Sequence, residues 1–138
     1  MKRVFVDTGA WIALAEQSDT HHLKANKIIE KLGNENALLI TSDYVLDETI
    51  TWLRYNVSHK VAVEFAAQVM TSNVTEVLYI DEAAFVKTTE LFNKYRDQKF
   101  SFTDCSSFVL MRTHRIKQAF AFDAHFLTAG FEILKPNV

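Results

Sequence analysis

The sequence predicts an α/β fold with a mostly parallel sheet, and three observations favour it. Short apolar runs typical of strands buried on both faces alternate with longer segments of helical period. Pro/Gly/Ser-rich linkers are absent, since the chain has one proline and three glycines. With 138 residues, 49% hydrophobic and 23% charged, the composition is that of a single globular domain, 1–138.

The strands are predicted from four apolar runs and a weaker fifth. If they are parallel, their carboxyl ends share one edge of the sheet, which is where open α/β sheets bind ligands. The predicted strands are RVFV (3–6), ALLI (37–40), EVLYI (76–80), QAFAF (118–122) and FEIL (131–134).

Between these runs the apolar spacing becomes helical, and polar residues that can cap helices stand at several of the boundaries. The first predicted helix directly follows Asp7, and the second follows Ser18 and Asp19 and can be closed by Gly33. The third carries the apolar stripe Leu46, Ile50, Leu53 and Val57. The fourth is capped by Ser58, the fifth is capped by Asp81, and the last runs from SFTD (101–104) to about Arg115.

Charge and cysteine content limit the function classes. A net charge of −2 gives no bulk field that would attract nucleic acid, so an RNA site must depend on local groups or bound cations. The single cysteine, Cys105, excludes an internal disulfide and a cysteine-rich zinc site, and fits a reducing cytosol. There is no signal-peptide pattern and no apolar run near the roughly 20 residues of a membrane span. We therefore expect a cytoplasmic protein without a membrane partner.

Four acidic residues fall where a ligand site would form. Asp7 and Asp123 follow the first and fourth predicted strands, Asp104 lies in the first turn of the last helix, and Glu48 lies within the third. Each has a structural explanation by itself: the strand-end acids can cap helices, Asp104 can form a capping box with Ser101, and Glu48 can face solvent.

Together, these acids favour a metal site. Carboxylates gathered within a few ångström repel one another, which raises their pKa values and costs stability. A hard divalent cation removes this cost, because Mg²⁺ and Mn²⁺ prefer oxygen ligands and often bind through a few carboxylates and a substrate phosphate.

Four segments in this order resemble the PIN-domain ribonucleases, especially the VapC-type toxins of toxin–antitoxin pairs. The similarity covers essentially the whole chain, and Asp7, Glu48, Asp104 and Asp123 match the acids of the family's motifs. Thr8 and Thr103 match its polar positions. The four segments are VFVDTGAWIAL, SDYVLDETITWLR, FSFTDCSSFVLMR and AFAFDAHF.

The resemblance implies a PIN-like three-layer α/β/α fold with about five parallel strands. It also implies one or two Mg²⁺ or Mn²⁺ ions and hydrolysis of RNA phosphodiester bonds by water whose pKa the metal lowers. Asp7 and Asp104 are expected to be the principal ligands. Glu48 and Asp123 are expected to act through water or on a second ion. The implied partners are the RNA substrate, a cognate antitoxin whose tail would fill the acidic groove, and a second copy of the chain.

Three further residues are candidates for RNA contact. Arg54 ends the Glu48 helix, Arg112 belongs to the basic run RTHRIK, and His125 follows Asp123 closely. A solvated helix end is the better explanation of Arg112, and a structural role explains His125 at least as well as RNA contact. The eleven phenylalanines are assigned to the core rather than to base stacking.

Two other functions are compatible with parts of the pattern. A phosphohydrolase could use Asp7 as a nucleophile, but that chemistry calls for a second acid close to Asp7, where TGAW stands, and a lysine after a later strand. A non-catalytic PIN-type module that binds RNA or docks proteins would not need four acids.

Overall fold

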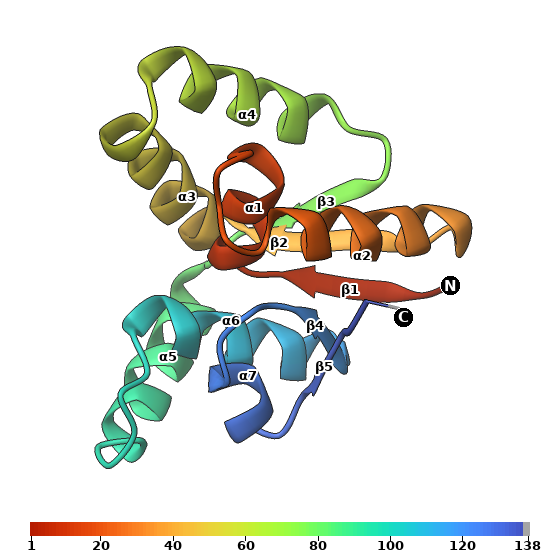
Figure 1. The fold of residues 1–138 in the computed structure, drawn as a ribbon. Coiled ribbons are helices and arrows are strands. Elements are labelled where there is room, and N and C mark those ends of the chain that lie inside the picture. The colour runs from red at the N-terminus through yellow and green to blue at the C-terminus, as the bar shows by residue number, and fades with distance from the viewer. Residues whose placement is uncertain (137–138) are drawn as a thin grey trace.

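The computed structural model describes residues 1–136 and contains one five-stranded sheet, all parallel, in the order β3-β2-β1-β4-β5 (Figure 1). This confirms the predicted fold class. The strands are β1 (Arg3–Val6), β2 (Leu38–Ser42), β3 (Thr75–Leu78), β4 (Gln118–Phe120) and β5 (Glu132–Ile133).

The strands differ from the sequence prediction mainly at their ends. β2 runs two residues further than expected, and β4 stops at Phe120 rather than at 122. β3 is an edge strand and is only partly buried, so the prediction that its run is buried on both faces is wrong. An edge strand has a neighbour on one side only, which leaves part of its surface open to solvent.

Helices cover both faces of the sheet, with α1 to α4 on one side and α5 to α7 on the other (Figure 1). Their bounds are α1 (Thr8–Ala15), α2 (His22–Asn34), α3 (Asp43–Asn56), α4 (His59–Thr71), α5 (Glu82–Lys94), α6 (Phe102–Thr113) and α7 (His125–Thr128). Among residues 1–136, no helix is long and apolar enough to span a membrane.

Three predicted helix caps are confirmed, and one helix begins and ends differently. The side chains of Ser58, Asp81 and Ser101 accept hydrogen bonds from backbone N–H groups in the first turns of α4, α5 and α6. In contrast, α2 starts after His21, because Asp19 closes a turn before the helix by accepting from the His21 N–H. Gly33 lies inside α2, and the residue with positive φ after it is Asn36, at 54°.

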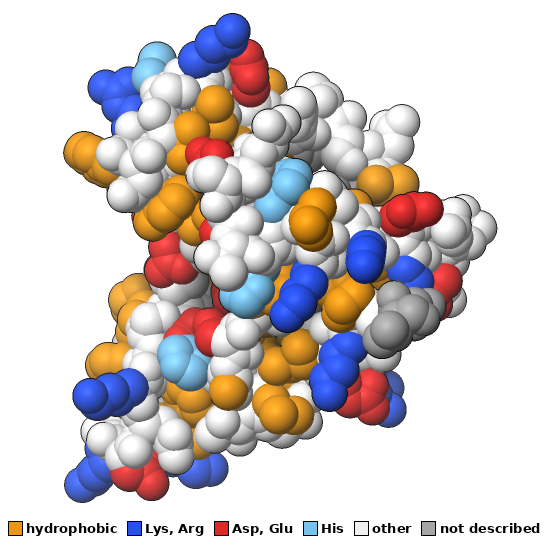
Figure 2. Space-filling view, viewed as in Figure 1, with side chains coloured by type: hydrophobic (Ala, Val, Ile, Leu, Met, Phe, Trp, Pro, Cys, Tyr) orange, Lys and Arg blue, Asp and Glu red, His pale blue; other side chains and the backbone are white. Residues whose placement is uncertain are grey.

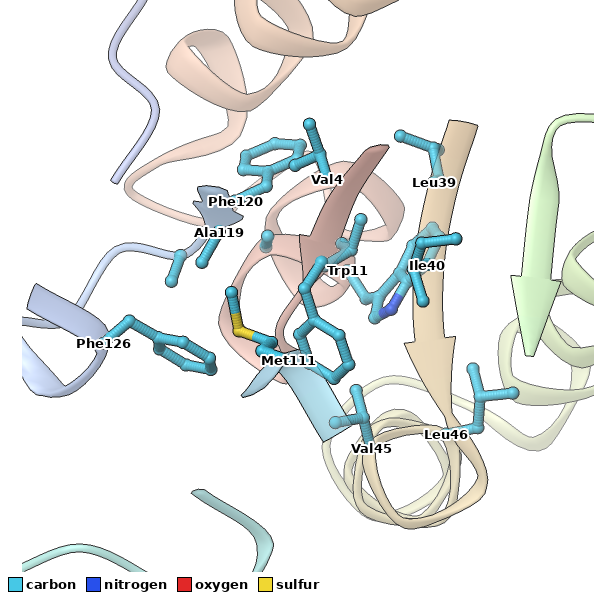
Figure 3. Packing of buried hydrophobic residues seen from close by; sticks show 14 of the residues in the cluster. Val4, Trp11, Leu39, Ile40, Val45, Leu46, Met111, Ala119, Phe120 and Phe126 are labelled. Atoms are coloured by element: carbon cyan, nitrogen blue, oxygen red, sulfur yellow. The ribbon is translucent and has the colours of Figure 1, made fainter. Parts of the chain in front are cut away.

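The core lies on both faces of the central strands (Figure 3). Phe5 of β1, Phe108 of α6, Phe120 of β4 and Phe126 of α7 are completely buried. The rings of Phe5 and Phe108 both contact that of Phe126, and the ring of Phe120 contacts that of Phe122. This packing fixes β1 and β4 as neighbours. The strand order reverses between them, so their carboxyl ends flank the crevice in which α/β sheets bind ligands.

A candidate active site at the carboxyl edge of the sheet

Asp7 is a buried carboxylate at the end of β1. Its side chain is 5% exposed and, although it stands at the N-cap position of α1, it makes no capping hydrogen bond. Burial raises its pKa to about 8. The charges of Asp123, Asp104 and Glu48 add to this effect, and the backbone N–H of Thr8 opposes it. Helix capping therefore does not explain Asp7, and the other three predicted acids all act on it electrostatically.

Thr8, the residue that follows, carries a buried hydroxyl without a partner. Its Oγ1 is the one such side-chain atom among the described residues that has no hydrogen-bond partner. A buried polar atom left unpaired costs roughly 1–3 kcal/mol, so such atoms commonly mark places where a ligand or water binds.

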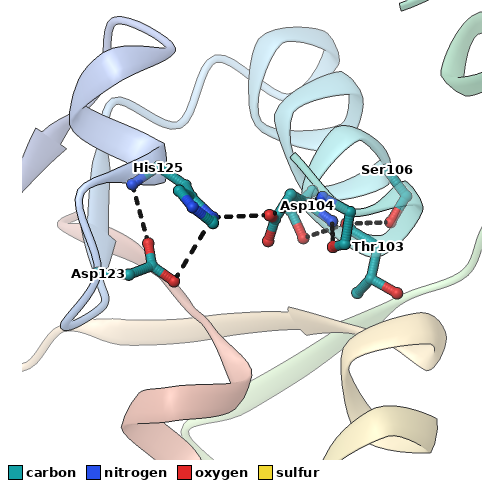
Figure 4. Close-up of polar contacts among 7 residues, drawn as sticks. Thr103, Asp104, Ser106, Asp123 and His125 are labelled. Atoms are coloured by element: carbon teal, nitrogen blue, oxygen red, sulfur yellow. Dashed lines mark hydrogen bonds and ion pairs between the residues drawn. The ribbon is translucent and has the colours of Figure 1, made fainter. Parts of the chain in front are cut away.

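Asp104 at the start of α6 and Asp123 after β4 both contact His125, the first residue of α7 (Figure 4). Oδ2 of Asp104 accepts the Ser101 N–H at 3.0 Å and lies 2.8 Å from Nδ1 of His125. Asp123 accepts the His125 backbone N–H at 2.9 Å, and its other oxygen lies 3.8 Å from the same Nδ1. Asp104 thus forms the predicted capping box and is also tied through His125 to Asp123.

Glu48 is exposed on α3 and borders an open hollow between α3 and α6, which Thr103 also lines. Figure 2 shows this side of the molecule hollowed between α3 above and α5 and α6 below, with acidic side chains at its base and hydrophobic side chains on both lips. Glu48 and Asp104 therefore approach the sheet edge from different helices.

The donor chemistry of this edge fits a hard cation. It offers carboxylate and hydroxyl oxygens, and a cation would favour the charged form of Asp7, whose pKa is raised first by burial and then by the neighbouring acids. However, within residues 1–136 no group of three or more Asp, Glu, His or Cys side chains is arranged as a metal-binding cluster. The assignment of Asp7, Glu48, Asp104 and Asp123 as metal ligands therefore stays a prediction.

Sequence comparison identifies the family. The family profile described as "PIN domain" matches residues 4–132. The chain belongs to the PIN-domain family. It is 33% identical over 134 residues to the 23S rRNA-specific endonuclease VapC20 of Mycobacterium tuberculosis, an alignment that covers 97% of this chain and 99% of that protein.

Solved structures agree with the assignment of this PIN domain. The crystal structure of M. tuberculosis VapC20, described as a Sarcin-Ricin loop cleaving toxin, has a TM-score of 0.87 at 34% identity, covering 96% of this chain and 99% of that one. VapBC2 from Rickettsia felis, bound to a DNA fragment from its promoter, has a TM-score of 0.73 at 10% identity, with 96% and 97% coverage. At that identity the second likeness shows the fold alone.

Two residues predicted to contact RNA lie away from the acids of this PIN domain. Arg54 borders a groove between α3 and α4 together with His59 and Val63. Arg112 is near the end of α6 opposite Asp104, where its guanidinium donates to the Tyr95 hydroxyl and the Ala129 carbonyl and lies over Phe131. The third, His125, does join the acids, as a hydrogen-bond partner of Asp104.

An exposed aromatic surface near Glu48 was not predicted from the sequence. Phe85 and Phe92 are about half exposed and contact Phe102, so not every phenylalanine belongs to the core. Trp52 and Tyr55 lie four and seven residues after Glu48, a spacing that places all three on one side of a helix. This spacing could have predicted that aromatic side chains lie on the same side of the helix as Glu48.

Proposed function

We propose that this protein is a metal-dependent endoribonuclease that hydrolyses RNA phosphodiester bonds and acts as the toxin of a toxin–antitoxin pair. The observation that carries the proposal is the buried carboxylate of Asp7 at the carboxyl edge of a PIN-family sheet, whose pKa is raised by burial and by the charges of Asp123, Asp104 and Glu48. Support also comes from 33% identity over nearly the whole chain to an rRNA endonuclease.

In this proposal Asp7 and Asp104 hold one Mg²⁺ or Mn²⁺ ion, while Glu48 and Asp123 act through water or on a second ion. The cation, when bound, lowers the pKa of water and offsets charge on the phosphodiester. The chain contributes a carboxylate at Asp7 that ionises more readily once positive charge is near, and an Asp104 oriented by Ser101 and His125. Thr8, the residue after Asp7, would add its unpartnered hydroxyl to the set of oxygen donors.

The proposed protein partners are an antitoxin and a second copy. An antitoxin tail carrying basic residues would complement the acidic edge and block access to it. For the homodimer, the supporting surface is the exposed apolar part of α5, formed by Phe85, Val86 and Phe92. Phe65 of α4 is buried against Trp11 and is unsuited to such a face.

The experiment that tests the activity is incubation of the purified protein with ribosomal RNA, transfer RNA and an unstructured oligoribonucleotide, with Mg²⁺, with Mn²⁺ or with excess chelator. We expect internal cuts that require metal, and the 23S rRNA is the first substrate to map because the relative VapC20 is specific for it. Retarded migration of intact RNA with every metal would instead favour the non-catalytic module.

A further inference from the structure

The hollow beside Glu48 and Thr103 extends beyond the acids, along α3 and toward its end. It has a volume of about 620 Å³ and is open on one side. Because Glu48 and Thr103 form part of its wall, anything bound there is continuous with the proposed site of cleavage. Nothing in the proposed hydrolysis of a phosphodiester uses the rest of this space.

Aromatic side chains make up much of the wall. Tyr44, Trp52 and Tyr55 come from α3, and Phe102 comes from the start of α6. Trp52 is 37% exposed and Tyr55 is 82% exposed, so their ring surfaces are available to a ligand. Phe102 is held in place by the rings of Tyr44, Phe85 and Phe92, with centroids 5.5 to 6.4 Å away.

The charges of the lining residues limit which ligands can bind in the hollow. Of the described residues 1–136, Asp47 and Glu48 are the acids that line the hollow, and no lysine or arginine among them does so. A phosphate group or a carboxylate would therefore be repelled. A neutral flat ring that carries N–H donors would complement both the aromatic faces and the oxygen acceptors of Asp47 and Thr51.

We propose that this hollow binds an unpaired nucleobase of the RNA beside the bond that is cut. The proposal rests on the ribonuclease function proposed above and names a site of base recognition within it. Protein recognition of single-stranded RNA commonly uses bases that are splayed out and stacked on aromatic rings. Here the base stacks on Trp52 or Tyr55, and Asp47 accepts a hydrogen bond from its exocyclic amino group, which adenine, cytosine and guanine have and uracil lacks.

Trp52 provides a direct readout of base binding. The other tryptophan, Trp11, is buried and donates to Thr41 Oγ1, so a ligand in the hollow changes mainly the emission of Trp52. The probes are hexameric oligo(A), oligo(C) and oligo(U) ribonucleotides, titrated onto the Asp7→Asn full-length protein so that RNA is not consumed. We expect saturable quenching that is strongest with oligo(A) or oligo(C), weakest with oligo(U), and absent in the Trp52→Phe form.

Removal of a stacking ring supplies the second arm of the test. Tyr55→Ala should weaken oligo(A) binding about tenfold, as expected for loss of one base–aromatic stack, and should raise KM for cleavage in the otherwise wild-type protein. The matched control is Tyr79→Ala, because Tyr79 is also an exposed tyrosine but does not line the hollow. Asp47→Ala should reduce the preference against oligo(U).

Each remaining outcome decides the matter. Absent quenching, or equal losses in Tyr55→Ala and Tyr79→Ala, would overturn the proposal. So would a Tyr55→Ala protein that binds RNA normally but changes its oligomeric state, since the hollow would then be an interface between copies. Quenching by oligo(A) without cleavage by the wild type would support the base site while contradicting the ribonuclease function.

Discussion

At the scale of single residues, the site consists of groups that are poorly satisfied without a ligand. Asp7 has its pKa raised to about 8, chiefly by burial, and Thr8 keeps a buried hydroxyl with no partner. Both features cost folding free energy, and the proposed cation would relieve both. The sequence allowed these positions to be predicted as a site, but their burial depends on the packing of α1 against the sheet.

The raised pKa of Asp7 predicts how stability depends on pH in metal-free protein. The folded state binds a proton at Asp7 between the ordinary pKa of 3.8 and about 8, where the unfolded chain does not, so this group lowers stability as pH rises through that window. The slope is at most about 1.4 kcal/mol per pH unit. Chemical denaturation of wild type and Asp7→Asn in chelator measures it. Parallel pH profiles for the two proteins would contradict the raised pKa.

The unpaired hydroxyl of Thr8 predicts opposite effects on stability and activity. Thr8→Val keeps the shape of the side chain and removes the orphaned oxygen, so the metal-free protein should be equally stable or up to about 1 kcal/mol more stable. Cleavage of RNA should fall, whereas Thr8→Ser should retain most of it. Denaturant unfolding and initial cleavage rates measure the two effects. A Thr8→Val protein with full activity would remove this hydroxyl from the site.

At the scale of elements, the start of α6 couples helix capping to the site. Ser101→Ala removes the side chain that accepts from the Asp104 N–H at 2.9 Å, and should cost about 1 kcal/mol. It should also reduce cleavage, because loss of the cap loosens the first turn of α6, which carries Asp104, even though the Ser101 backbone N–H that holds the Asp104 carboxylate is kept. Ser58→Ala is the matched control: Ser58 caps α4 in the same manner, at 3.1 Å, away from the acids. Equal RNA cleavage by Ser101→Ala and Ser58→Ala would show that the Ser101 cap does not contribute to activity.

Most strands and helix caps could be predicted from short-range patterns in the sequence. Apolar runs located all five strands, and Ser58, Asp81 and Ser101 were recognised as caps because the bond each one makes is local in sequence. The start of α2 was misplaced, since Asp19 caps a turn rather than the helix. The link from His125 to Asp104 joins residues 21 positions apart and depends on tertiary packing. For the same reason, the hollow formed by α3 and α6 could not be predicted.

At the scale of the whole molecule, the exposed apolar surface of α5 predicts self-association. Val86 is 49% exposed, so Val86→Glu should leave the fold intact and weaken a dimer by at least about tenfold, because it places a charge in an apolar contact. Light scattering coupled to size exclusion measures the mass. Leu127→Glu, an exposed site on α7, is the control and should leave the mass unchanged. A wild-type protein that is monomeric at all concentrations would contradict the dimer.

The acids at the sheet edge are proposed to form a catalytic metal site. The most direct measurement is thermal unfolding of wild type and Asp7→Asn titrated with Mn²⁺ and then Mg²⁺, with RNA cleavage assayed in the same samples. Ligands that bind the folded state raise its stability by mass action. We predict that metal stabilises only the wild type. Asp7→Asn should remain folded but cleave RNA at least about 100-fold more slowly. A folded Asp7→Asn protein that cuts RNA at the wild-type rate, or a wild type indifferent to metal in both assays, would contradict it.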